Sequence, residues 1–247
     1  MNPEEIQDNV CRVEERIQRA CERARRDRRE VQLIAVSKTF SPEHVRAALT
    51  AGVTVFGENR VQEATEKFNA VALSLRNPTR AHTGESPARA FKLHLIGHLQ
   101  SNKARPAAGI FDMIHTVDRL EIARKLSAYC EQLNRLLPIL IQVNIGNEET
   151  KSGVDSRHVR ELVQQVSLLK PLRVRGLMAI PPFTDHPEDS RSHFQSLRQL
   201  AEGIARERIE NVSMHELSMG MSHDFEVAIE EGATMVRVGT AIFGGRG

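Results

Sequence analysis

Lys38 is the residue with the clearest chemical potential, because it directly follows the first hydrophobic strand expected in the chain. Residues Leu33 to Val36 form an unbroken apolar run, which is typical of a strand covered on both faces. A parallel strand that ends there delivers Lys38 to the mouth of an α/β fold. A partly buried lysine at such a mouth has a lowered pKa and can form a Schiff base with an aldehyde. The alternative is a solvent-facing lysine that merely caps the strand.

Two turns of small residues late in the chain are suited to binding a phosphate. Ser218 to Ser222 follows the seventh expected strand, and Gly239-Thr240 follows the eighth. Hydroxyls and closely approaching backbone amides bind anions in such turns, and phosphate often lies beside these two loops of a barrel. Either turn alone could simply cap a helix. With Lys38 they indicate a phosphorylated aldehyde, of which pyridoxal 5′-phosphate (PLP) is the commonest in proteins.

Two further polar residues lie close to these segments. Arg237 is inside the eighth expected strand, where a charge is costly unless it is paired. It could form a structural ion pair with Glu216, or it could contact the ring or phosphate of a cofactor. Asn59 follows the second strand and could either cap the next helix or contact the ligand.

Short apolar strands alternate with amphipathic segments along the whole chain, and this alternation favours a (β/α)8 TIM barrel, with a doubly wound sheet as the alternative. Helix starts are expected at Ser41-Pro42-Glu43, at Asp118 with Glu121, and at Ser222. A helix near residues 3–27 could take the place left vacant after the last strand. The expected strands are Val31–Val36, Val53–Phe56, Lys92–Ile96, Met113–Val117, Ile139–Asn144, Arg173–Ala179, Ser213–Leu217 and Thr234–Val238.

Composition limits the remaining possibilities. The chain has 247 residues, 40% of them hydrophobic, and a formal net charge of +2, so a polyanionic partner is not required. The arginine cluster at residues 23–29 is expected to be a solvated helix end rather than a nucleic-acid contact. The cysteine spacing argues against a disulfide framework, and no His or Cys pair has metal-site spacing.

The organisation of the chain also follows from its composition. No secretory signal or membrane span is visible, so we expect a cytoplasmic protein. The polar stretch Ser74–Ala90 is expected to be a loop insertion in a single domain of residues 1–247.

The same segments resemble the YggS/PROSC family of PLP homeostasis proteins, and the resemblance runs along nearly the whole chain. The matching segments are Ala35–Thr39, Phe56–Glu63, His94–Lys103, Gln142–Ile145, Lys151–Gly153, Gly176–Met178, Leu217–Asp224 and Val236–Gly244. The resemblance implies a fold-type III barrel that holds PLP on Lys38 as an internal aldimine. It also implies that Ser218 and Gly239-Thr240 hold the phosphate, that Arg237 lies near the cofactor and that Asn59 lines the pocket.

The resemblance further implies a carrier or buffer of PLP without established catalytic turnover, which would serve vitamin B6 balance and could supply PLP-dependent apo-enzymes. The main rival is a fold-type III racemase or decarboxylase. A racemase needs a second acid or base opposite the lysine, and the only tyrosine, Tyr129, is expected in core packing. With no residues left for a second domain, we expect a monomer.

An aldolase-like barrel that uses Lys38 on a sugar phosphate is the third possibility. It would need a nearby acid or base, such as Glu58, Glu216 or Asp224.

Overall fold

The computed structural model describes residues 1–75, 90–146, 148 and 152–245, and within them eight parallel strands close into a barrel. Around the ring the strands run in the order β4-β3-β2-β1-β9-β8-β7-β5, and β4 pairs with β5 to complete it. The short β6 pairs with the end of β5 outside the ring. The closing pair excludes the open doubly wound sheet and confirms the (β/α)8 barrel.

All eight expected strands are present, with modest shifts of their ends. The strands are β1 (Gln32–Val36), β2 (Val55–Glu58), β3 (Lys92–Leu95), β4 (Met113–Val117), β5 (Leu137–Asn144), β6 (Val154–Asp155), β7 (Leu172–Ala179), β8 (Val212–Met221) and β9 (Met235–Val238). The largest difference is in β8, which continues past Leu217 through Ser218 to Met221.

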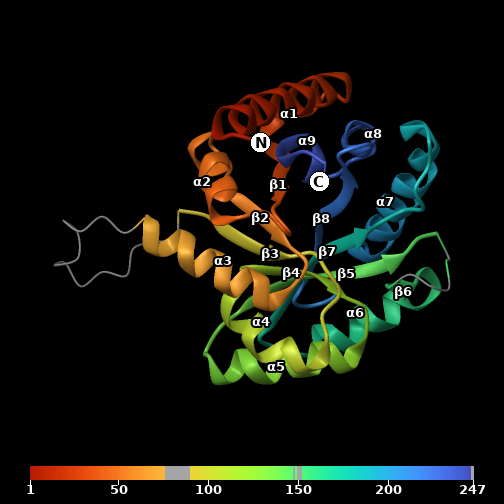
Figure 1. Ribbon diagram of the computed structural model, residues 1–247. Helices are drawn as coiled ribbons and strands as arrows, with labels where there is room; N and C mark the ends of the chain where they lie inside the picture. The colour runs from red at the N-terminus through yellow and green to blue at the C-terminus, as the bar shows by residue number, and fades with distance from the viewer. Residues whose placement is uncertain (76–89, 147, 149–151, 246–247) are drawn as a thin grey trace.

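Helices surround the barrel on its outside (Figure 1). They are α1 (Pro3–Arg23), α2 (Pro42–Thr50), α3 (Val61–Ser74), α4 (Ala104–Ile110), α5 (Leu120–Gln132), α6 (Val159–Ser167), α7 (Arg191–Ala205), α8 (Phe225–Glu230) and α9 (Thr240–Phe243). In the described part of the chain they are accompanied by the short 3-10 turns η1 (Arg28–Glu30), η3 (Ser101–Lys103), η4 (Ser156–His158) and η5 (Pro187–Ser190). No helix among the described residues is long and apolar enough to cross a membrane.

The N-terminal helix α1 takes the place of the helix missing after the last strand, as expected. Figure 1 shows it beside α2, α8 and the single turn of α9. Its buried face packs into the main core, and the side chain of Asn9 donates a hydrogen bond to the carbonyl of Ile242 in α9. The two ends of the chain are therefore joined by the helix that closes the outer layer.

The arginine cluster is a set of structural contacts at the end of α1. Arg23 pairs with Glu230, Arg28 with Glu14, and Arg29 with Asp27. Arg26 donates to the carbonyls of Ile229 and Ala233 at the end of α8 and beyond. The contacts of Arg23 and Arg26 therefore attach the end of α1 to α8 and the residues after it, whereas those of Arg28 and Arg29 are local.

Two expected helix caps differ from those in the structure. Helix α5 begins after Arg119 without a side-chain cap, and Glu121 pairs with Lys125 and Ser101 instead of completing a capping box with Asp118. Asp224, and not Ser222, precedes α8. Pro42 does open α2 after Ser41. The insertion predicted at Ser74–Ala90 lies outside the described residues, except for its ends, and Ser74 is the last residue of α3.

Candidate functional site

The predicted site residues come from four strands that are neighbours in the barrel, β2, β1, β9 and β8. Lys38 follows β1, Asn59 follows β2, and Gly239 with Thr240 follows β9. Arg237 is within β9 and Ser218 within β8. Because all barrel strands are parallel, the residues that follow β1, β2 and β9 meet at the same end of the barrel, which we call the mouth.

Side-chain alternation decides which residues face the inside of the barrel. Ile34 belongs to the apolar cluster inside the barrel, whereas Ala35 belongs to the core between the strands and the helices. This period of two puts Val36 on the inner side, while Ser37 bonds Glu58 and Lys67 on the helix side. Continued beyond the strand, the same period predicts the inner side for Lys38. The same count in β2, from Val55 inside the barrel, places Asn59 on the inner side of the mouth.

Lys38 lies in a tight turn and is partly buried. The N–H of Phe40 donates to the carbonyl of Ser37, which closes the turn. Thr39 has φ 69°, a left-handed conformation that is rare for a β-branched residue. The sequence around Lys38 therefore adopts a strained turn at the predicted reactive residue, as often occurs at functional sites.

Asn59 is in the turn after β2, which is in close contact with the turn after β3. It is partly buried, and a Cβ atom on Gly97 would lie 2.4 Å from its carbonyl oxygen. Only glycine fits at position 97, so this close approach fixes the backbone on which Asn59 is carried. Helix α3 begins at Val61, and Arg60 occupies the N-cap position, so Asn59 is not its cap.

Arg237 is buried inside the barrel, and its guanidinium donates to two neutral oxygens. Nη1 is 2.7 Å from Oγ of Ser218, and Nη2 is 2.9 Å from the carbonyl oxygen of Ala179. Burial lowers the pKa of Arg237 to about 10, although Asp224 acts in the opposite direction. Among the described residues no carboxylate lies within ion-pair distance, and Glu216 instead accepts a bond from Thr234. The proposed Arg237–Glu216 ion pair is therefore not formed.

Ser218 continues this polar contact toward two buried histidines. Its Oγ lies 2.9 Å from Nδ1 of His115, whose Nε2 lies 3.0 Å from Nδ1 of His94. Burial lowers the pKa of His94 to about 3 and holds the pKa of His115 well below its usual value, so both rings are neutral at pH 7. An arginine can only donate, so the consistent assignment runs from Arg237 through the Ser218 hydroxyl to His115 and then His94.

The Gly239-Thr240 turn gathers hydrogen-bond donors around one oxygen. The hydroxyl oxygen of Ser222 accepts from the N–H groups of Gly239 and Ala241, at 3.1 and 3.4 Å. A phosphate oxygen accepts hydrogen bonds from the same kinds of donor. This turn therefore carries the types of donor that a phosphate group requires, and Thr240 adds a second, exposed hydroxyl beside them.

Sequence reasoning missed the partners of these residues. Ser222 was expected in the first phosphate-binding turn and as a helix cap, but not as a partner of the Gly239 and Ala241 amides. His115 and Lys67 were not predicted, because each lies in an ordinary apolar pattern of a strand or helix. Their signal is the burial of a polar residue, which depends on neighbours far apart in the sequence.

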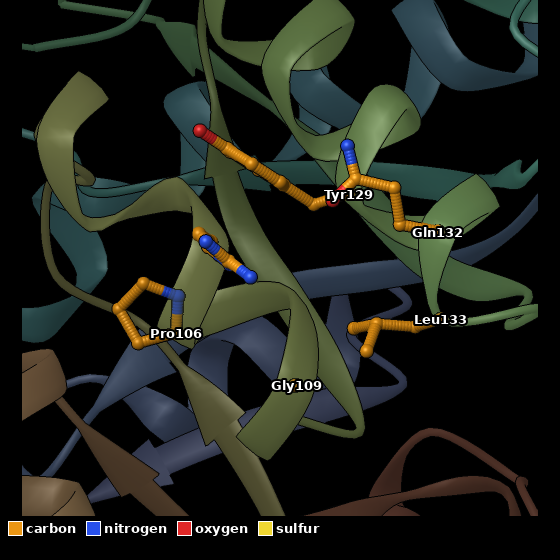
Figure 2. A pocket seen from close by; sticks show the side chains of 6 residues that line it. Pro106, Gly109, Tyr129, Gln132 and Leu133 are labelled. Carbon is orange, nitrogen blue, oxygen red and sulfur yellow. The ribbon is translucent and has the colours of Figure 1, made fainter.

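Tyr129 lies away from the mouth. It lines a hollow of about 430 Å³ between α4 and α5, together with Pro106 and Leu133 (Figure 2). Helices of a (β/α)8 barrel run back toward the opposite end, so the last turns of α5 carry Tyr129 away from Lys38. The structure supports a packing role for this residue.

Comparisons with known proteins extend along the whole chain. The family described as alanine racemase, N-terminal domain, matches residues 9–247. A protein of Aquifex aeolicus named pyridoxal phosphate homeostasis protein is 43% identical over 240 residues, which cover 97% of each chain. The protein of the same name from Escherichia coli strain K12 is 40% identical over 98% of this chain and 97% of its own.

Solved structures agree with these relatives. PipY of Synechococcus elongatus, solved with PLP bound, has a TM-score of 0.75 and 38% identity, covering 87% of this chain and 93% of its own. An alanine racemase of Clostridium difficile has a TM-score of 0.70 at 13% identity and shares the fold, with this chain covering 57% of it. The barrel, the site and the relatives lead to one conclusion: the chain belongs to the family of pyridoxal phosphate homeostasis proteins.

Proposed function

We propose that this protein binds PLP covalently through the amine of Lys38 and takes part in intracellular PLP homeostasis. The observation that carries the proposal is that β1 and β9 are neighbours, with Gly239 packed against Val36, two residues before Lys38. PipY, a relative of similar length, has been solved with PLP bound.

Each site residue has a distinct part in this proposal. The amides after Gly239, with the hydroxyls of Thr240 and Ser222, would hold the phosphate. Asn59 and Arg237 would line the cofactor from the mouth and from the barrel interior. Ser218 is fully buried and bonded to Arg237, so it would act on the ligand mainly by holding that guanidinium. Its direct contact with the phosphate, expected from the sequence, stays a prediction.

The chemistry needed for a carrier is reversible. A lysine amine condenses with the aldehyde of PLP and releases one water, and addition of water reverses the bond. Lys38 supplies the amine, while the phosphate-binding turn supplies affinity that does not depend on the covalent bond. Holding and releasing the cofactor then require no further reaction.

Three features support a carrier over an enzyme. Tyr129, the tyrosine that could serve as a second acid or base, lies at the far end of α5. Glu58 faces α3 on the outer side of the barrel wall, where it bonds to Lys67, and so is not a base at the mouth. Arg237, with a pKa of about 10, keeps its proton at neutral pH and so cannot accept a proton from a bound ligand. The rival function is that of a racemase or decarboxylase, and the experiment must distinguish it from a carrier.

We further propose that residues 1–247 form one domain that works as a cytoplasmic monomer and delivers PLP to apo-enzymes. The shared naming of relatives as homeostasis proteins supports this role. Static light scattering would test the monomer, with a mass near 27.7 kDa expected.

The deciding experiment titrates the purified protein with PLP and follows the absorbance of the lysine-bound cofactor. Wild type should bind PLP and reactivate a PLP-dependent apo-enzyme, while showing no racemisation or decarboxylation of amino acids. Lys38→Ala should lose the absorbance band, and Lys92→Ala, at the exposed start of β3, should keep it. Steady turnover of an amino acid by wild type would favour the enzyme, and an unchanged band in Lys38→Ala would refute attachment through this lysine.

A further inference from the structure

Lys67 lies behind the Lys38 turn, on the helix side of the barrel wall. Helix α3 carries it there, and only 7% of the residue is exposed. Its Nζ is 2.6 Å from the carbonyl oxygen of Ser37, 2.8 Å from Oε1 of Glu58 and 2.9 Å from Oε1 of Glu63. An ammonium group has three N–H donors, so each of them has an acceptor in this cluster.

The charges of this cluster are balanced inside it. Burial raises the pKa of Glu58, although Lys67 and Ser37 act in the opposite direction. Burial also acts to raise the pKa of Glu63, but the hydrogen bonds from Lys67 and from the Thr39 N–H outweigh it and lower the pKa. Glu63 therefore keeps the negative charge that a buried ammonium needs as a partner.

The cluster contacts the peptide groups on both sides of Lys38. Lys67 bonds the carbonyl of Ser37, and Glu63 accepts the backbone N–H of Thr39. The Ser37 hydroxyl adds a bond of 2.7 Å to Oε1 of Glu58. Thr39 is the residue with φ 69°, so its N–H bond to Glu63 holds the strained peptide of the turn.

The cluster lies on the helix side of the barrel wall, where Lys67 of α3 bonds to Ser37 and Glu58. Continued past the strand ends, alternation predicts the inner side of the mouth for Lys38 and Asn59. Lys67 therefore acts on a ligand at the mouth only through the backbone of residues 37–39. Such a residue positions another group and does not itself contact the ligand.

We propose that Lys67 is the positioning residue for Lys38. Together with Glu63 it fixes the two peptide groups that flank Lys38, so that the amine of Lys38 is held toward the mouth before any ligand arrives. The role of this amine rests on the proposed function, whereas the bracing of the turn rests on the contacts alone.

The first test compares Lys67→Met, Lys67→Arg and the control Lys125→Met, an exposed lysine of α5 paired with Glu121. For each folded variant, a PLP titration gives the apparent affinity, and the absorbance band is followed against pH. Losing a charged hydrogen bond to the turn should weaken PLP affinity in Lys67→Met about tenfold or more, and shift the pH at which the band changes. Lys67→Arg should recover part of the affinity, and Lys125→Met should match wild type.

A folded Lys67→Met protein with the affinity and pH profile of wild type would overturn the proposal. A loss of thermal stability without either change would have the same meaning, because it would assign Lys67 to the fold alone.

The second test keeps Lys67 and needs no ligand. Glu63→Ala removes the acceptor of the Thr39 N–H, and Glu66→Ala removes an exposed glutamate from the same helix as a control. Amide hydrogen exchange of Thr39, measured by NMR, should become at least about tenfold faster in Glu63→Ala only. Equal exchange rates of the Thr39 amide in wild type and Glu63→Ala would overturn the claim that Glu63 holds this turn.

The two tests separate the two ideas. If wild-type protein forms no bond with PLP, the proposed function fails, yet the exchange of Thr39 still decides whether the turn is braced. If PLP binds normally in every folded variant and the exchange is unchanged, the brace fails and the proposed function stands.

Discussion

The inside of the barrel has two layers of opposite character. The layer far from the mouth is apolar, and its side chains come from residues Ile34, Val55, Met113, Leu140, Met178 and Met235. Two residues further along the strands, Met113 is followed by His115, Leu140 by Gln142, and Met235 by Arg237. A step of two residues keeps the side chain on the same face, so these three strands change from packing to polar contacts as they approach the mouth.

This difference separates stability from ligand binding within the same strands. Apolar side chains stabilise the barrel through burial and close packing. In the polar layer, hydrogen bonds join Arg237 to Ser218, Ser218 to His115 and His115 to His94. Each of these side chains therefore has a polar partner inside the barrel. Such a chain fixes the orientation of Arg237, and its members are costly to leave without partners.

The largest stability effect is expected from emptying the apolar layer. Leu140→Ala removes a fully buried side chain and should lower the free energy of unfolding by about 2–5 kcal/mol. PLP affinity of the folded fraction should stay within about twofold of wild type. Chemical denaturation with a parallel PLP titration would check both values, and a large loss of affinity would show that the layers are not separable.

Acidification should break the polar layer selectively. His94 and His115 have pKa values below those of the unfolded chain, so the unfolded state binds more protons below pH 6.5. Stability is therefore lost as the pH falls from about 6.5 toward the folded pKa values. Between pH 7 and 5.5 each histidine should lower the free energy of unfolding by about 1.3 kcal/mol, or about 2.5 kcal/mol for both.

The matching variant is His94→Gln, in which this pH dependence should be weaker. Glu58, whose pKa is raised, contributes with the opposite sign. Its contribution is common to both proteins and cancels when their denaturation curves are compared. The same pH dependence in both would contradict the assignment of His94 as a buried neutral ring.

A smaller effect is expected from breaking, at Ser218, the series of hydrogen bonds that runs from Arg237 to the two histidines. Ser218→Ala leaves Nη1 of Arg237 without its hydroxyl partner and should cost about 2 kcal/mol of stability. It should also weaken PLP binding, because the guanidinium is no longer held. Ser196→Ala, in the exposed part of α7, is the matched control. Unchanged PLP affinity in Ser218→Ala would show that this series of hydrogen bonds does not affect ligand binding.

The smallest effect is expected outside the barrel. Arg29→Ala removes an exposed ion pair with Asp27, and such pairs contribute little because water screens them. The midpoint of thermal unfolding and the affinity for PLP should both be unchanged. A marked loss of either would show that the arginine cluster does more than fasten the end of α1.

Local patterns predicted the framework well. The eight strands, the barrel and the role of α1 follow from apolar runs and helical periodicity, since burial imposes these patterns on the sequence. The end of β8 was misplaced because Ser218, Gly220 and Met221 have the composition of a turn, although Ser218 is buried inside the barrel.

The site could be predicted only in part. Lys38, Asn59 and Gly239 are placed at the mouth by strand ends alone, which a sequence reveals. The contacts that support these residues could not be predicted in this way. Lys67 and Ser37 are 30 positions apart in the sequence, and His115 and Ser218 are 103 positions apart. Contacts of this kind depend on the closed barrel, which brings distant strands and helices together.

Attachment of PLP to Lys38 is the central claim, and one measurement tests it most directly. The protein is saturated with PLP, reduced with borohydride, digested and analysed by mass spectrometry, with Lys38→Ala treated in parallel. We predict a phosphopyridoxyl group on the peptide that contains Lys38 and no corresponding modification in the variant. Absence of that group from saturated wild-type protein, or its presence on other lysines while Lys38 stays unmodified, would contradict the account.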